Sequence, residues 1–252
     1  PTKQVYPDTI LSVSDGLQPN QLGWFHANPA SIWESVLTHQ GLGEFIKMGH
    51  DTLRHRIFGC LLQGNEMKIK SPTELESTGA HPHYHITLIP HTEDPSQPKD
   101  WLNHAQMLLK KISQEPIEKL YTNHKNWWGA FWNRSWLFAS GTPEADLLTR
   151  GYILQRWIAA CGGRGNYPIK FNGSIFTVNT ERKYDPDYRR WGGMFWFQNT
   201  RLPYWAMLMS GDFDLFQPFI KMYTEIAPLA RFRTQVYSNH GGWFMPETMT
   251  FW

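Results

Sequence analysis

The chain has 252 residues and a mass of 29.5 kDa, which is enough for one large domain or two smaller ones. Only 18% of its residues are charged and its formal net charge is +2, which argues against a protein that binds nucleic acid through a concentrated basic face. The sequence has no leader-like start and no apolar run of about 18 residues, so we expect no membrane span.

Tryptophan is the unusual feature of the composition. The chain has 13 tryptophans, and aromatic residues together make up 15% of it. Indole rings are common where an apolar face meets polar partners. This content is explained either by a large aromatic core or by a cleft for a ligand with apolar faces and many hydroxyls, namely a sugar.

The two cysteines, Cys60 and Cys161, lie far apart in the sequence and have no companions at metal-ligand spacing. We therefore predict two buried free thiols and no disulfide. No motif indicates a cofactor, and none is expected.

Residues 1–99 consist of short β-type runs, such as 86–89, separated by clusters of Pro, Gly, Ser and His. A short helix is expected near residues 29–38. The pattern predicts the C-terminal part of a β-sandwich-like domain. His83 and His85 would share one face of a strand, a spacing that can serve a metal, but no carboxylate or third ligand stands at a suitable offset. We therefore predict exposed or hydrogen-bonded histidines and no metal site.

Apolar residues recur at helical spacing from residue 100 onward. Residues 100–140 are expected to form a helical linker. Thr142 is then expected to cap a helix that has Pro143 in its first turn and stops at Gly162 and Gly163.

A helical hairpin is predicted near the end of the chain. Its first helix covers residues 199–209, its second starts near Asp212, and a tight turn beginning at Ser210 joins them. Pro203 is expected in the first turn of the first helix. Pro228 is expected to kink or break the second helix.

The hairpin also predicts where the longer segments lie. Because the tight turn is at one end of the helices, residues 162–195 and 237–252 should emerge together at the other end. Long glycine-rich and aromatic segments at one end and tight turns at the other are typical of a cleft in an α/α barrel. Residues 141–252 are therefore expected to supply hairpins of such a barrel.

The runs YILQRW and GGRGNYPIKFNG, followed by QNTRLPYW, resemble the barrel entry of the inverting glycoside hydrolases that include bacterial α-L-fucosidases and α-L-galactosidases. The likeness is greater to an uncharacterised group of bacterial, exported relatives with the strings RRWGG and QNTRLPYW, and it covers roughly residues 127–252. The resemblance implies a mainly α fold with an N-terminal β part, in which a segment of a six-hairpin α/α toroid follows the end of a β-sandwich. It also implies a secreted or periplasmic protein.

In the fucosidases an N-x-N pair before a Tyr-Trp dipeptide helps a carboxylate position the attacking water. Asn199 matches the second Asn, but Phe197 stands at the first position, which argues against α-L-fucose as the substrate. By the same matching, the family's acid and base carboxylates would lie beyond Trp252, so an incomplete barrel is expected.

Inverting hydrolysis needs a carboxylic acid and a carboxylate about 6.5–9.5 Å apart on opposite faces of the sugar. The candidates in the two long segments are Glu247 and Asp187. The alternative roles are a cap or a pair with Arg201 for Glu247, and a pair with a neighbouring arginine for Asp187. Polar side chains that suit hydroxyl recognition, and tryptophans that suit a sugar platform, are Asn199, Arg201, Lys170, Asn172, His240, Trp191, Trp196 and Trp243.

The sequence therefore predicts a glycoside hydrolase that acts on an oligosaccharide or polysaccharide by inverting general acid/base hydrolysis. A non-catalytic carbohydrate-binding protein is one alternative. A polysaccharide lyase on an α/α toroid is the other, with His240 or Tyr237 as its base.

Overall fold

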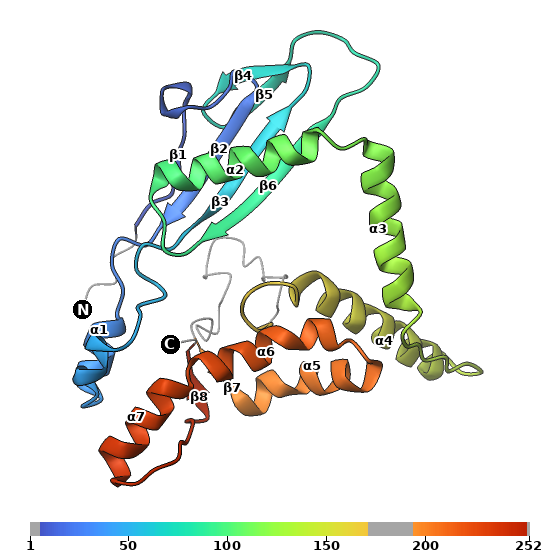
Figure 1. Ribbon diagram of the computed structural model, residues 1–252. Helices are drawn as coiled ribbons and strands as arrows, with labels where there is room; N and C mark the ends of the chain where they lie inside the picture. Colours follow the sequence, from blue (N-terminus) through green and yellow to red (C-terminus); the bar gives the residue numbers. More distant parts are fainter. Residues whose placement is uncertain (1–5, 171–193, 251–252) are drawn as a thin grey trace. The chain divides into compact units, whose positions relative to one another are not determined.

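The computed structural model describes residues 6–170 and 194–250, and the chain divides into two compact units (Figure 1). Unit 1 comprises Pro1–Ile46 and His50–Leu120, and unit 2 comprises Lys47–Gly49 and Tyr121–Trp252. Each unit contains a hydrophobic cluster of its own.

Unit 1 is built on a four-stranded antiparallel sheet with the strand order β1-β2-β3-β6. A two-stranded ribbon, β4-β5, accompanies it. The elements of this unit, in chain order, are β1 (Thr9–Ile10), η1 (Val13–Asp15), β2 (Gln21–Ala27), α1 (Trp33–His39), η2 (Gly43–Lys47), β3 (Ile57–Gly64), β4 (Met67–Ser71), β5 (Glu74–Ser77), β6 (Ile86–Glu93) and α2 (Pro98–Ser113).

Helix α2 lies across one face of this sheet (Figure 1). Side chains alternate between the two faces of a strand, so Phe25, Leu61 and Ile89 share the face that α2 covers. Trp101 and Ala105, one helical turn apart on α2, are completely buried against them. The core of unit 1 is therefore a sheet face closed by a single amphipathic helix.

The predicted β-rich N-terminal part is confirmed, but the β-sandwich arrangement is not found in the described part of unit 1. A sandwich needs a second sheet packed face to face with the first, and here the covering layer is α2. The opposite face carries exposed apolar side chains, namely Ile10, Trp24, Phe58 and Leu88.

Unit 2 is mainly helical. Its elements are the greater part of α3 (Ile117–Trp132), followed by α4 (Pro143–Gly162), β7 (Phe195–Trp196), α5 (Phe197–Ser210), α6 (Phe213–Glu225), α7 (Ala227–Ser238) and β8 (Thr248–Met249). The core cluster draws on α3, α4, α5 and α6 and consists of Phe131, Ala159, Ala160, Ile169, Tyr204, Met207, Leu215 and Phe219.

Several local predictions for unit 2 are confirmed. The Thr142 side chain accepts a hydrogen bond from the Ala145 amide, 3.3 Å away, at the start of α4. Helices α5 and α6 pack as a hairpin, and Gly211 takes the left-handed conformation, φ 73°, that the tight turn between them requires. Pro228 stands in the first turn of α7, where α6 has already ended.

The prediction for Pro203 is wrong, because α5 begins at Phe197 and Pro203 lies inside the helix. Proline has no N–H, so the carbonyl of Asn199, four residues earlier, loses its intrahelical donor. Pro218 lies inside α6 in the same way.

The expected fold class, a segment of an α/α toroid, is wrong. A toroid repeats helical hairpins around an axis, but the described residues contain a single well-packed hairpin, α5–α6. The next helix, α7, follows α6 directly after the break at Ile226 and does not start a second long hairpin. The toroid was expected from the arrangement of long and short connections as well as from the family resemblance, and the single hairpin α5–α6 satisfies that arrangement without a toroid.

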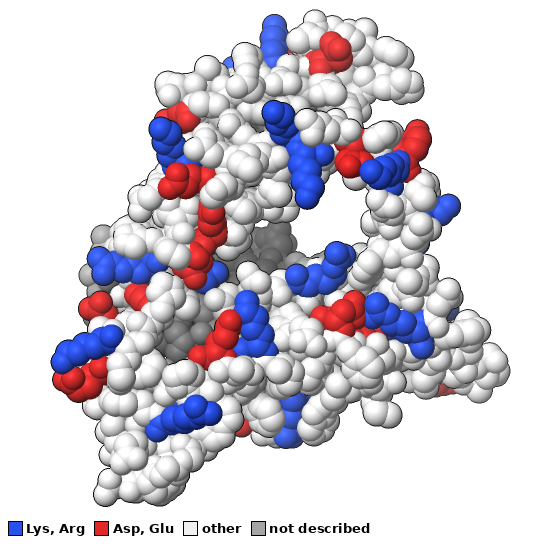
Figure 2. All heavy atoms as spheres, in the orientation of Figure 1, with Lys and Arg blue, Asp and Glu red and all other residues white. Residues whose placement is uncertain are grey.

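No helix in the described ranges is both long enough and apolar enough to span a membrane. Figure 2 shows basic and acidic side chains interspersed on the visible face of the molecule. This distribution agrees with the low formal net charge of +2.

Candidate functional site

The start of α5 brings two distant parts of unit 2 together. Strand β7 pairs with β8, with Trp196 opposite Thr248, and the Phe197 amide donates to the Glu247 carbonyl at 2.9 Å. The described ends of the two long segments therefore meet at this end of α5, as predicted, while the α5–α6 turn lies at the other end. We name this region the β7–α5 site, defined by Lys170, Trp196, Asn199, Arg201, Tyr223 and Glu247.

The Glu247 carboxylate is held by the N-terminus of α5. Its Oε1 accepts a hydrogen bond from the Gln198 amide at 2.8 Å, and the side chain is exposed. Gln198 lies in the first turn, where amides have no acceptor within the helix, and a helix N-terminus attracts negative charge. Glu247 is therefore a capping group, as its alternative role required, and its carboxylate has a fixed position at the surface.

Tyr223 is a half-buried tyrosine of this site, and the negative charge of Glu247 acts on it. Its ring packs edge-on against Phe197, with ring centroids 5.8 Å apart, and its buried hydroxyl has no hydrogen-bond partner. Burial, together with the negative charge of Glu247, raises the pKa of Tyr223 to about 12. The hydroxyl therefore stays a donor throughout the physiological range.

Arg201 is oriented by aromatic rings. Its guanidinium lies 4.6 Å from the ring centroid of Trp205 and 5.5 Å from that of Phe197. Its Nε is buried and has no hydrogen-bond partner, so this donor is positioned without being used by the described residues. The pair of Glu247 with Arg201 that was offered as an alternative does not form within salt-bridge distance.

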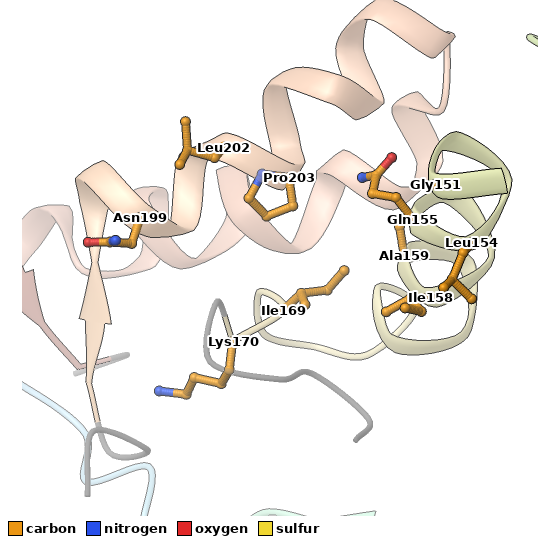
Figure 3. Close-up of a pocket in the computed structure, with 10 residues that line it drawn as sticks. All are labelled: Gly151, Leu154, Gln155, Ile158, Ala159, Ile169, Lys170, Asn199, Leu202 and Pro203. Atoms are coloured by element: carbon orange, nitrogen blue, oxygen red, sulfur yellow. The ribbon is translucent and has the colours of Figure 1, made fainter. Parts of the chain in front are cut away.

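A cavity of about 570 Å³ lies between α4 and α5. This volume falls in the range of small-molecule sites. The walls are mostly apolar, with amides from Gln155 and Asn199 and the Lys170 ammonium as polar groups (Figure 3). The Lys170 Nζ donates to the Met194 carbonyl at 2.9 Å and lies 3.6 Å from the centroid of the Phe195 ring, which fixes the lysine next to β7.

Other predicted site residues lie elsewhere or outside the described residues. His240 is exposed in the segment after α7, where its Nδ1 contacts the Gly241 carbonyl at 2.6 Å. Trp243 is half-exposed and lies 5.4 Å from the Arg231 guanidinium of α7. Neither has a described contact with the β7–α5 site. Asp187, Asn172 and Trp191 fall outside the residues that the structure describes.

Sequence reasoning missed a second group of polar side chains, in unit 1. His91 and Glu93 from β6 and His104 from α2 form the His91–Glu93–His104 cluster, in which one potential ligand atom from each residue lies within 4.8 Å of the others. The signal was present, since His91 and Glu93 alternate on one strand face, but His104 joins them only through tertiary packing. His83 and His85, which the sequence suggested, precede β6 and are exposed.

Both cysteines are free, as predicted. Cys60 is buried, and this burial raises the pKa of its thiol. Cys161 is exposed, so the prediction that both thiols are buried is wrong for it.

Comparison with known proteins places the chain in a family. The model of DUF5703_N, described as "Domain of unknown function (DUF5703)", matches residues 2–137. This range includes every element from β1 to α3 and therefore the His91–Glu93–His104 cluster, and it ends before the β7–α5 site. No curated protein and no solved structure matches the chain. Since the match spans more than half of the sequence, the chain belongs to the DUF5703 family.

Proposed function

We propose that unit 2 binds a carbohydrate at the β7–α5 site and that the protein hydrolyses a glycosidic bond there. One observation carries this proposal. The Glu247 carboxylate is fixed on the N-terminus of α5, in the same helix end that presents Asn199 and Arg201.

The side chains around this carboxylate suit the recognition of hydroxyl groups. Asn199 and Lys170 line the cavity, and the Arg201 guanidinium lies in the same helix end, against the Trp205 ring. A sugar offers many hydroxyl oxygens together with apolar C–H faces, and it gains most from a few fixed polar groups beside apolar or aromatic walls. The half-buried Trp196, next to Asn199 in this helix end, is the candidate platform.

Glu247 is the proposed base. An exposed carboxylate with a fixed position can take a proton from an attacking water. Inverting hydrolysis needs a second carboxyl group about 6.5–9.5 Å away. Asp187, from the segment that leads into β7, remains the candidate for this acid.

A carbohydrate-binding role without catalysis is the second candidate. It is favoured by the hydrogen bond between Glu247 and the Gln198 amide, because capping of α5 explains the position of this carboxylate without a catalytic role. The lyase alternative gains no such support, since the described contacts of His240 stay within its own segment.

A screen of the purified chain tests the proposal. Aryl glycosides, neutral oligosaccharides and uronic-acid polymers are added, binding is followed by the shift in melting temperature, and products are followed as new reducing ends and as unsaturated sugars. New reducing ends without unsaturated sugars support hydrolysis. Binding without either product supports the second candidate.

Variants connect the result to the site. Asn199→Ala should weaken ligand binding at least about tenfold if this amide is bonded to the sugar, because it leaves ligand hydroxyls unpaired. Glu225→Gln, an exposed carboxylate on α6, is the matched control and should change nothing. If no carbohydrate binds to the chain, or if binding is indifferent to Asn199, the proposal is wrong.

A further inference from the structure

The polar edge of the unit 1 core has the composition of a metal site. On β6 the buried Ile89 belongs to the core face, and His91 and Glu93 continue that face beyond it. On α2 the buried Trp101 is followed one turn later by His104. The apolar residues of β6 and α2 therefore lie in the same core, and their potential metal ligands lie together at the edge of that core.

The strand ligands are held in position by their neighbours. The Trp101 indole N–H donates to the His91 carbonyl at 3.1 Å, and its ring lies against the His91 imidazole with centroids 6.1 Å apart. The Ser96 hydroxyl donates to Glu93 Oε2 at 2.9 Å. Outer partners of this kind orient metal ligands.

One ligand atom is buried without a partner. The Nε2 atom of His91 has no hydrogen bond, and its distance to Glu93 Oε2, 3.8 Å, is too long for one. A buried polar atom without a partner is costly, so its presence needs an explanation. An ion between this nitrogen and the carboxylate would satisfy it.

The distances fit an ion after a small adjustment. Ligand atoms at about 2.0–2.2 Å from a tetrahedral Zn²⁺ lie roughly 3.3–3.6 Å from one another. In the cluster, His104 Nδ1 is 2.5 Å from Glu93 Oε1, and His91 Nε2 is 3.8 Å from Glu93 Oε2. His104 is half-exposed and can move outward by about an ångström.

We propose that His91, Glu93 and His104 bind a divalent transition-metal ion, with Zn²⁺ as the best match, and that the ion joins β6 to α2. Two imidazoles and one carboxylate are a ligand set that Zn²⁺ accepts, and they leave a fourth position for water. Among the described residues this is the sole group of three such side chains close enough to hold an ion.

Zinc titration of the full chain after chelator treatment tests this proposal. With a competing chromophoric chelator, we expect one Zn²⁺ per chain and a higher melting temperature once Zn²⁺ is added. Glu93→Gln and His104→Gln should each weaken binding at least about tenfold. His104→Cys should retain binding, because a thiolate is a good Zn²⁺ ligand.

A control variant and a folding check separate loss of metal binding from loss of structure. His83→Gln removes an exposed histidine of the same unit and should leave the affinity unchanged. His104 is half-exposed, and Glu93→Gln keeps an acceptor for Ser96, so both variants should fold, which circular dichroism verifies. If no Zn²⁺ binds, or if folded Glu93→Gln and His104→Gln bind it as the wild type does, the proposal is overturned and the cluster is a histidine–carboxylate hydrogen bond.

Discussion

Arg156 of α4 and Asp212 at the α5–α6 turn form a buried ion pair in which each side chain is only 2% exposed. The Arg156 Nη2 lies 2.8 Å from Oδ1, and its Nε lies 3.1 Å from Oδ2 of the same carboxylate. Arg156 also donates to the Phe131 carbonyl, and its guanidinium lies 4.2 Å from the centroid of the Phe131 ring. One side chain thus connects α3 and α4 to the turn of the hairpin.

Replacement of Arg156 by alanine should be strongly destabilising. It would leave the Asp212 carboxylate buried without its main partner, which typically costs about 3–5 kcal/mol in the free energy of unfolding. Urea denaturation measures this loss. Arg150→Ala on an exposed position of the same helix is the control and should stay within about 0.5 kcal/mol of wild type. A small effect of Arg156→Ala would show that the pair adds little to the stability of unit 2.

Alkaline pH should destabilise unit 2 through its buried tyrosines. Burial raises the pKa of Tyr204 and of Tyr223 to about 12, against an ordinary value of 10.0. Between these two values the unfolded chain loses both protons while the folded chain keeps them. The free energy of unfolding is therefore unaffected below pH 10 and falls as the pH rises from 10 toward 12.

Tyrosinate absorbance and urea unfolding across this pH range check the prediction. Tyr204→Phe should reduce the alkaline loss. It should also cost about 1–3 kcal/mol at neutral pH, because the buried Ile169 amide loses the Tyr204 oxygen, its acceptor at 2.7 Å. Tyr121→Phe, at an exposed position, is the matched control. Equal alkaline slopes for wild type and Tyr204→Phe would contradict the expectation.

Local signals in the sequence predicted local structure well. Thr142 caps α4, and Pro228 marks the break between α6 and α7, because both depend on the backbone of a few neighbouring residues. Pro203 was misplaced because α5 begins at Phe197, directly after β7, and not at residue 199, so the proline falls inside the helix in spite of its cost.

Long-range relations were harder to predict. The meeting of the two long segments at β7 and β8 followed from helix directions alone, and it was correct. The toroid was inferred from the placement of long and short connections and from the family resemblance, and it was wrong, because a single hairpin gives the same placement. His104 could not be joined to His91 and Glu93 from sequence, because the face of α2 that meets the sheet is decided by Trp101 and its packing.

Two glycines should respond to alanine in opposite directions. At Gly129 in α3 an added Cβ meets nothing within 4 Å, so Gly129→Ala should stabilise the protein by up to about 1 kcal/mol through helix propensity.

At Gly59 the added Cβ would lie 2.1 Å from the Trp24 carbonyl oxygen, so β2 and β3 must move apart. Gly59→Ala should therefore cost about 3 kcal/mol or more. Thermal unfolding of the Gly129→Ala and Gly59→Ala variants tests both expectations. An unchanged melting temperature for Gly59→Ala would show that the sheet adjusts to the added Cβ.

Two substitutions of Glu247 distinguish a capping role from a catalytic one. Glu247→Ala removes the acceptor of the Gln198 amide and should cost about 0.5–2 kcal/mol of stability in either case. Glu247→Gln keeps an oxygen for that amide but cannot take a proton, so it should lose much less stability. If Glu247 is the base, the glutamine variant still binds the carbohydrate and its hydrolysis falls by about 100-fold or more. If hydrolysis by Glu247→Gln equals that of wild type, the carboxylate is a cap alone, and the base must be sought on another residue.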